Sequence, residues 1–394
     1  MTRYGWTGLV ASRCAASGSS SSSPPPSPSA LSSSTARRRT AIDIRSRRFS
    51  AEYSGFATTT AANYITKRTT TTTTTNTTRS ENFGTLKVWG RDRNGIVARC
   101  TQILGAYGCN ITKSEHWTDI QNRMFFQRLE FRYQELGLFD ESTKQLCRLQ
   151  INEGLRDLEE QQPESDHPEI QKQNDRNSSP TILQSSLNWR DRRKKIGILV
   201  SKMDHCLWEL LLRHSAHELD ADVHTVVSNH DTLHAVADAF GIPYHHTPLH
   251  SDMSSSERKI VEQQQLELLK DVDVVVLARY MQVLSPQFLE HFPPDGIINI
   301  HHSFLPAFMG SRPYHNAYER GVKLIGATAH YVTSDLDEGP ILEQDVIAVS
   351  HRDSVKQLIQ KGRILERNVL FRALDAHLSD RTIIHGNRTI VFGD

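Results

Sequence analysis

The chain has 394 residues, with 46 Lys and Arg against 45 Asp and Glu, so its formal net charge is +1. This near-equal number of positive and negative side chains predicts neither binding of nucleic acid by bulk electrostatics nor docking on an anionic membrane. No apolar run approaches the roughly 18 residues that cross a bilayer, and the five cysteines include no C-x-x-C pair. We therefore expect a soluble protein of a reducing compartment that acts on a small molecule.

The first 80 residues differ in composition from the rest. They combine a Ser- and Pro-rich tract at 17–34, an Arg-rich stretch at 37–48 and a run of threonines at 69–75, with only two acidic residues. Such a segment cannot pack a core, and its Arg-rich, Ser-rich, acid-poor composition is typical of an organellar transit peptide. We expect a mitochondrial protein, with chloroplast or cytosol as alternatives, the last if the segment is a plain disordered tail.

Residues 84–158 have the pattern of a small α+β domain. A strand-like alternation is followed by the turn 91–95 and by apolar residues at helical spacing, which Gly108 ends. Two more strand-like runs and a second helix follow. The expected elements are strands at 85–89, 110–116 and 123–132 and helices at 96–107 and 141–158.

Residues 159–193 are polar with few apolar anchors, so we expect a linker there. From residue 194 to 394 strands and helices alternate, which predicts a mostly parallel, doubly wound sheet with helices on both faces. The expected strands are 196–200, 221–227, 272–277, 296–300 and 325–332. The expected helices are 207–216, 232–240, 256–269, a short one from Ser285-Pro286, and 354–377, before a hairpin over 381–392.

The first candidate site follows the strand at 296–300. Ligands of open parallel sheets bind outside the carboxyl ends of the strands. Asn299 and His301 are two residues apart on an extended segment, so their side chains share a face. An amide donor and a protonatable imidazole in that arrangement can stabilise a developing oxyanion.

The second candidate site follows the strand at 325–332, where the chain enters an acidic turn. Asp337 in this turn could hold an imidazole charged, orient a water and shuttle its proton. Taken singly, Asp335 and Asp337 fit Asx turns equally well, and His330 fits a core histidine. No H-E-x-x-H or C-x-x-C spacing is present, so we expect no metal.

Taken together, the two sites resemble the signature of the folate-dependent formyltransferase fold. Their sequences are Asn299-Ile-His301-x-Ser303-x-Leu-Pro306 and His330-x6-Asp337-x-Gly339. The resemblance implies that Asn299, His301 and Asp337 are a catalytic triad acting on a formyl carbon. It also implies that Ser303 and His330 belong to the substrate site.

Within that fold, the chain is similar to the deformylase branch. Residues 200–207 contain no glycine where glycinamide ribonucleotide formyltransferases have a phosphate-binding Gly-rich loop, and instead resemble the S-K-x-x-H-C-L stretch of deformylases. Residues 278–286 and 308–320 are also similar to deformylase segments. The positions that match the apolar lining of a pterin pocket are Met281, Leu284 and Leu289.

The domain at 84–158 resembles an ACT domain, with Asp92-Arg-Asn94-Gly95 at the D-R-x-G corner. Many relatives have proline where this chain has Asn94. The resemblance implies a βαββαβ fold, a homo-oligomer, and an amino-acid effector near Asp92, Asn94 and Gly95. An ACT domain ahead of a formyltransferase-like domain is the arrangement of the formyltetrahydrofolate deformylase family.

We therefore expect hydrolysis of 10-formyltetrahydrofolate to formate and tetrahydrofolate, which would serve one-carbon and purine metabolism. No cofactor is expected, because the folate is the substrate. Two alternatives stay open. One is a formyltransferase acting on glycinamide ribonucleotide, and the other is a non-catalytic ACT protein that senses an amino acid.

Overall fold

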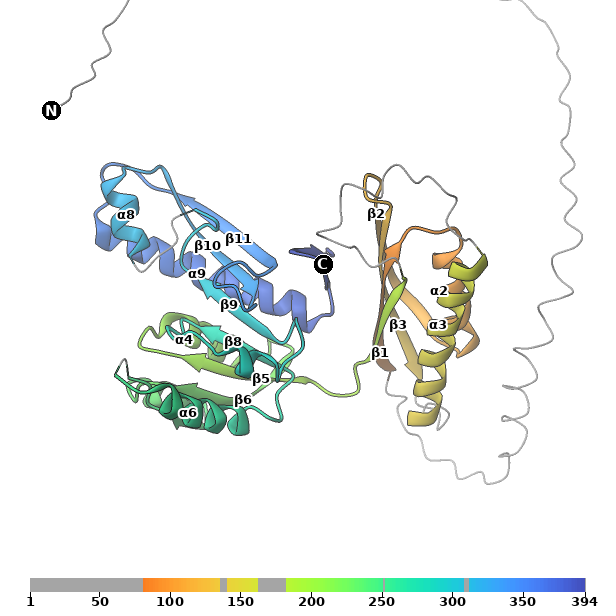
Figure 1. Cartoon of the computed structure of the whole chain (residues 1–394), viewed down its shortest axis with the longest axis horizontal. Coiled ribbons are helices and arrows are strands. Elements are labelled where there is room, and N and C mark those ends of the chain that lie inside the picture. The colour runs from red at the N-terminus through yellow and green to blue at the C-terminus, as the bar shows by residue number, and fades with distance from the viewer. Residues whose placement is uncertain (1–80, 135–139, 162–181, 251, 308–311, 394) are drawn as a thin grey trace, which may run out of the picture. The chain divides into compact units, whose positions relative to one another are not determined.

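The computed structural model of the chain describes residues 81–134, 140–161, 182–250, 252–307 and 312–393 (Figure 1). The expected transit segment, residues 1–80, lies outside these residues, as does much of the expected linker, 162–181. None of the helices in the described ranges combines the length and apolarity that a bilayer crossing requires.

The N-terminal described part is the expected βαββαβ unit. Its strands form one antiparallel sheet in the order β2-β3-β1-β4. Gly95 precedes the first helix with φ of 93°, a left-handed conformation that glycine adopts without steric cost. The elements are β1 (Glu81–Arg91), α2 (Ile96–Ala106), β2 (Asn110–Asp119), β3 (Met124–Gln134), α3 (Glu141–Gln161) and β4 (Gln184–Trp189).

The last strand of this unit corrects the expected linker. Residues 184–189 form β4, which pairs antiparallel with β1, so the linker predicted over 159–193 does not extend through them. Leu187 and Trp189 of this strand are buried in the same core as Leu86 and Val88 of β1. The sequence of this segment is polar overall because its buried residues are separated by Asn188 and serines, and the alternation of Leu187 and Trp189 is too short to indicate a strand.

The C-terminal part contains a seven-stranded sheet in the order β11-β10-β9-β8-β5-β6-β7 and a two-stranded hairpin. The sequence patterns missed β7, α8 and β11, and placed the other elements to within a few residues. The elements are β5 (Lys194–Val200), α4 (His205–Ser215), β6 (Ala221–Ser228), α5 (His234–Asp238), β7 (Tyr244–His246), α6 (Ser255–Leu268), β8 (Val274–Ala278), α7 (Pro286–Leu289), β9 (Ile297–His301), α8 (Pro313–Glu319), β10 (Leu324–Tyr331), β11 (Ile341–Ala348), α9 (Val355–Leu378), β12 (Thr382–His385) and β13 (Arg388–Val391).

The seven-stranded sheet is parallel from β9 to β7, and its other edge is antiparallel. β5, β6, β7, β8 and β9 pair in parallel, whereas β10 pairs antiparallel with both β9 and β11. The prediction of a mostly parallel sheet is therefore confirmed. Because β10 runs against β9, however, its exit lies beside the start of β9, where the Val332 amide donates to the Ile297 carbonyl at 3.0 Å.

Both faces of this sheet are buried, as continuous apolar strands require. Ile198 and Val200 of β5 face a core shared with α4 and α9, whereas Leu199 faces a second core on the opposite side with Phe288 of α7. In Figure 1, α9 lies along β9, β10 and β11, and it also packs against α4. Its start is fixed by a capping box in which Ser354 accepts from the Gln357 amide.

Candidate active site

His301, the last residue of β9, contacts Asp337 from the turn after β10. The imidazole Nδ1 lies 3.1 Å from Oδ1 of Asp337. Only 7% of the surface of His301 is exposed, so this charged or hydrogen-bonded pair is shielded from bulk water. β10 is antiparallel to β9, so it ends beside the start of β9. The turn after β10 therefore folds back toward the carboxyl end of β9, where His301 lies.

The turn that carries Asp337 is held in an uncommon conformation. Asp337 has φ of 60°, which costs a non-glycine residue energy and is found mostly where surrounding structure enforces it, often at functional sites. Gly339 lies so close to the end of β10 that a Cβ on it would be 1.8 Å from the carbonyl oxygen of Tyr331. Glycine at position 339 therefore allows the turn to press against the strand.

Asn299 is oriented by His330. The two residues are direct partners across β9 and β10, and Nδ2 of Asn299 lies 3.2 Å from Nε2 of His330. Nδ1 of His330 lies 2.9 Å from the carbonyl oxygen of Tyr331, so this nitrogen carries the proton and Nε2 accepts from the Asn299 amide. Burial lowers the pKa of His330, which keeps the ring neutral in this role.

Asp337 is an ionised carboxylate with room for one more partner. The hydrogen bond from His301 lowers its pKa, against an opposing effect of partial burial, and the charge of His301 adds to the lowering. Nε2 of His330 is 3.8 Å from the same Oδ1. Since His301 is bonded to Oδ1, Oδ2 is left to orient a water molecule.

The other nitrogen of His301 has no partner among the described residues. Nε2 is buried and makes no hydrogen bond within them. A buried donor or acceptor without a partner costs about 1–3 kcal/mol, and such atoms are rare in folded proteins. This nitrogen, with the second N–H of the Asn299 amide, therefore offers two polar groups to a bound substrate.

The remaining predicted substrate residues lie in different surroundings. The Ser303 hydroxyl donates to the Ala307 carbonyl at 3.1 Å and so holds the loop after β9. Leu284 and Leu289 pack in the hydrophobic core that contains Phe288, whereas Met281 is 53% exposed after β8. Their assignment to a pterin pocket stays a prediction.

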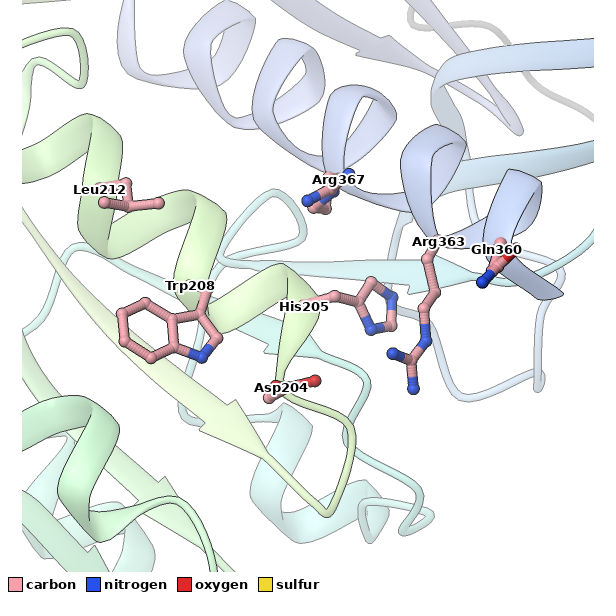
Figure 2. A pocket seen from close by; sticks show the side chains of 7 residues that line it. All are labelled: Asp204, His205, Trp208, Leu212, Gln360, Arg363 and Arg367. Carbon is pink, nitrogen blue, oxygen red and sulfur yellow. The ribbon is translucent and has the colours of Figure 1, made fainter. Parts of the chain in front are cut away.

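Two cavities are found in the described C-terminal part, and neither is lined by Asn299, His301 or Asp337. The first, of about 420 Å³, is drawn in Figure 2. Its walls come from the start of α4 and from α9, and its lining residues are Asp204, His205, Trp208, Leu212, Gln360, Arg363 and Arg367. The second, of about 350 Å³, lies under the loop after β9 and includes His302, Ser303 and Tyr314 in its walls.

The sequence patterns missed a second polar cluster behind the histidines. Glu366 of α9 is 1% exposed, and His205, Tyr314 and Arg279 all approach its carboxylate. His205 and Glu366 are 161 positions apart, so no local spacing revealed the contact. One signal was available: Glu366 falls at helical spacing with Leu365, Val369 and Leu370 on the buried stripe of α9.

The predicted effector corner in the N-terminal part is a tight turn. The amide of Asp92 donates to the Arg123 carbonyl at 2.7 Å, and the exposed Asn94 and Gly95 precede α2. The structure thus places Asp92, Asn94 and Gly95 together at the strand-to-helix turn. Effector binding there stays a prediction.

The α/β sheet with a histidine, a carboxylate and an amide converging over β9 is the architecture of a formyl-transfer domain. A protein-family model described as "Formyl transferase" matches residues 194–374. The chain is 41% identical over 313 residues to formyltetrahydrofolate deformylase of Synechocystis sp., covering 78% of this chain and 98% of that protein. It is 42% identical over 317 residues to formyltetrahydrofolate deformylase of Bacillus subtilis, covering 79% and 95%.

Solved structures agree with this grouping. A crystal structure of a formyltetrahydrofolate deformylase from Pseudomonas syringae pv. tomato superposes with a TM-score of 0.68 at 37% identity, covering 79% of this chain and 95% of that one. The chain belongs to the formyltetrahydrofolate deformylase family.

The contact between His301 and Asp337 predicts a measurable shift. In His301→Ala the main cause of the lowered Asp337 pKa is gone, so this pKa should rise. Carboxyl carbon NMR of Asp-labelled protein measures it, and Asp337→Asn assigns the resonance. Because the pKa of Asp337 is depressed in the folded protein, its ionised carboxylate contributes to the free energy of unfolding above the unfolded-state pKa near 3.8. This contribution is lost as pH falls through the folded-state pKa. An unchanged or lower Asp337 pKa in His301→Ala would contradict the contact.

Proposed function

We propose that this chain hydrolyses 10-formyltetrahydrofolate to formate and tetrahydrofolate, with Asp337, His301 and Asn299 as its catalytic residues. The observation that supports these roles is the 3.1 Å contact of Asp337 with His301 beside an unpaired, buried imidazole nitrogen. Family membership supports the substrate, since the relatives are named for deformylation of formyltetrahydrofolate.

Each residue has one task in the proposed reaction. Oδ2 of Asp337 orients a water molecule and takes its proton as the water oxygen bonds to the formyl carbon. Nε2–H of a cationic His301 and the second N–H of Asn299 donate to the resulting oxyanion, an interaction worth about 3–4 kcal/mol for one preorganised donor. Asp337 then delivers this proton to N10, the bond between the formyl carbon and N10 breaks, and the formic acid that results loses its remaining acidic proton to solvent, so that formate and tetrahydrofolate are the products.

The charges of the site fit this sequence of steps. A cationic His301 forms a close ion pair with Asp337, so neither charge is uncompensated in a poorly hydrated region. His330 stays neutral and holds Asn299 by accepting from one of its two amide hydrogens. Because His330 fixes the Asn299 amide, its remaining hydrogen keeps one direction, and the amide needs little reorganisation when the oxyanion forms.

Incubating the purified chain with 10-formyltetrahydrofolate, with and without glycinamide ribonucleotide, tests the reaction type. We expect formate release at the same rate in both samples, because water is the acceptor. Loss of the formyl group only with the ribonucleotide would instead identify a transferase. No turnover in either sample would favour the non-catalytic sensor.

The variant Asp337→Asn tests the proposed base. An amide of equal size cannot accept the water proton, so we expect kcat to fall by about 10²–10⁴-fold while tetrahydrofolate binding, measured by calorimetry, is retained. Asp335→Asn, in the same turn but outside the contacts of His301, is the matched control and should keep near-normal kcat. A near-normal rate in Asp337→Asn would remove this residue from the mechanism.

We also propose that the N-terminal unit binds an amino-acid effector at the turn 92–95 and takes part in a homo-oligomer. The turn is exposed at Asp92, Asn94 and Gly95, and β2 is an edge strand of its sheet, whose outer backbone groups can pair with another chain. Supply of formate and tetrahydrofolate to one-carbon and purine metabolism is the corresponding proposed role.

Import into mitochondria is a separate proposal and rests on the composition of residues 1–80. The bacterial relatives lend it no support. Fusing residues 1–80 to a fluorescent reporter should give a mitochondrial signal, because the segment is rich in Arg and Ser and poor in acids. Replacing its arginines with glutamines is the control and should abolish import. A chloroplast signal would favour the alternative organelle, and diffuse cytosolic signal would contradict import.

A further inference from the structure

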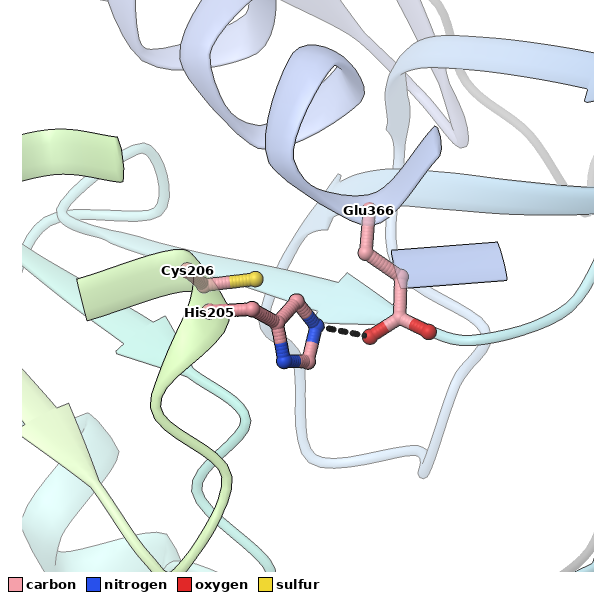
Figure 3. Close-up of side chains that lie close together, drawn as sticks. All are labelled: His205, Cys206 and Glu366. Carbon is pink, nitrogen blue, oxygen red and sulfur yellow. Dashed lines mark hydrogen bonds and ion pairs between the residues drawn. The ribbon is translucent and has the colours of Figure 1, made fainter. Parts of the chain in front are cut away.

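Glu366 is a buried carboxylate that the proposed reaction does not use. It lies on α9, and three side chains from three other segments approach it. Nε2 of His205, at the start of α4, is 2.8 Å from Oε2, as Figure 3 shows. The Tyr314 hydroxyl of α8 donates to Oε1 at 2.5 Å, and Nε of Arg279, just after β8, is 3.3 Å from Oε2 in an ion pair without hydrogen-bond geometry.

The fold makes room for this arrangement at one glycine. Gly362 is one helical turn before Glu366, and a Cβ on it would lie 2.0 Å from the Tyr314 hydroxyl oxygen. A glycine inside a helix is less favourable than alanine. Here the glycine lets the phenol lie against α9 and reach the carboxylate.

The approach of Arg279 also comes with backbone strain. Arg279 has φ of 63° directly after β8, although it is not a glycine. Residues in such conformations are strained, and they persist where the surrounding structure enforces them. The Arg279 side chain forms its ion pair with Glu366 of α9 at the carboxyl end of β8, the end of a parallel strand outside which ligands bind.

The Glu366 cluster, defined as Glu366, His205, Tyr314 and Arg279, backs the catalytic histidine through one intervening ring. The Tyr314 ring meets the His302 ring edge-on at 6.2 Å between centroids, and the His302 ring lies 5.1 Å from that of His301. Burial, together with the positive charge of Arg279, lowers the pKa of His302 to about 3. His302 is therefore a neutral ring between Tyr314 and His301, and the contact with Tyr314 helps to fix its position.

A metal ion is the competing occupant of this cluster. One ligand atom each from His205, Cys206 and Glu366 lies within 4.8 Å of the others, and the three side chains converge in Figure 3. Yet the Glu366 carboxylate already contacts Arg279, His205 and Tyr314. Arg363 and Arg367 also line the cavity that His205 borders (Figure 2). A dication would be repelled by these guanidinium groups, so the contacts favour a hydrogen-bonded cluster.

We propose that Glu366 is a positioning residue for the reaction proposed above: its carboxylate holds Arg279 and Tyr314 against His302, and so fixes the His301 imidazole that faces Asp337. Glu366 remains ionised, because donation from His205 and the charge of Arg279 outweigh the effect of burial on its pKa. The inference rests on the proposed function and adds the residues that keep the catalytic pair in register.

A double-mutant cycle tests this role. Glu366→Gln keeps the size of the side chain but leaves Arg279 without its counter-charge. We expect kcat for formate release to fall by about 10- to 100-fold with KM unchanged, as small displacements of catalytic groups do. In an Arg279→Gln background the same change should cost less than about threefold, because the two residues act as one unit.

The controls separate this role from others. Glu319→Gln, on the exposed surface of α8, should leave kcat unchanged. If Glu366→Gln fails to fold, Tyr314→Phe tests the same contact with the ring retained, and the exposed Tyr318→Phe is its matched control. The hydrogen-bonded cluster also predicts no bound metal by elemental analysis of the purified protein, and normal kcat in Cys206→Ala.

Three outcomes would overturn the proposal. The first is wild-type kcat in Glu366→Gln or, where that variant does not fold, in Tyr314→Phe. The second is an equal loss of kcat on Glu366→Gln in the wild-type and the Arg279→Gln backgrounds. The third is a stoichiometric bound metal that disappears in Cys206→Ala. A wild-type protein that releases no formate is a failure of the proposed function instead. The two failures are therefore distinguishable in one set of assays.

Discussion

The contact between Nδ1 of His301 and the carboxylate of Asp337 is the interaction on which the site depends. It joins the end of β9 to the turn after β10, which begins beside the start of β9 because β10 runs antiparallel to β9. The turn must therefore fold back toward the end of β9. Two local features allow this: the left-handed backbone of Asp337 and the close approach of Gly339 to β10. Asn299 and His330 are a cross-strand pair of the same two strands.

Two carboxylates with different surroundings flank the histidines. Asp337 is partly open and paired on one oxygen, which suits a group that handles water. Glu366 is buried and contacted on both oxygens, which suits a group that holds its neighbours in place. Chemically similar side chains thus fit different tasks because burial and partners differ. The long helix α9 carries the second carboxylate, and its packing along β9, β10 and β11 joins that cluster to the sheet.

The sequence predicted most of the fold because its signals are local, whereas Asn299, His301 and Asp337 were predicted as catalytic residues from the resemblance of their two motifs to the formyltransferase signature. Strand and helix periods are visible in short windows, and Asn299 and His301 share a face through a spacing of two. Long-range features were not visible. Three features depend on residues far apart in the sequence: the antiparallel direction of β10, the pairing of β4 with β1, and the contact of His205 with Glu366. Apolar identity alone also could not separate Leu284, which is in a core, from the exposed Met281.

The most direct test of the account is where the formyl group binds. A crystal structure of Asp337→Asn soaked with 10-formyltetrahydrofolate would trap the substrate before hydrolysis. The account predicts the formyl oxygen within hydrogen-bond distance of Nδ2 of Asn299 and Nε2 of His301, with the formyl carbon facing the side chain at position 337. A formyl group bound away from these atoms, for example in the cavity lined by His302 and Tyr314, would contradict it.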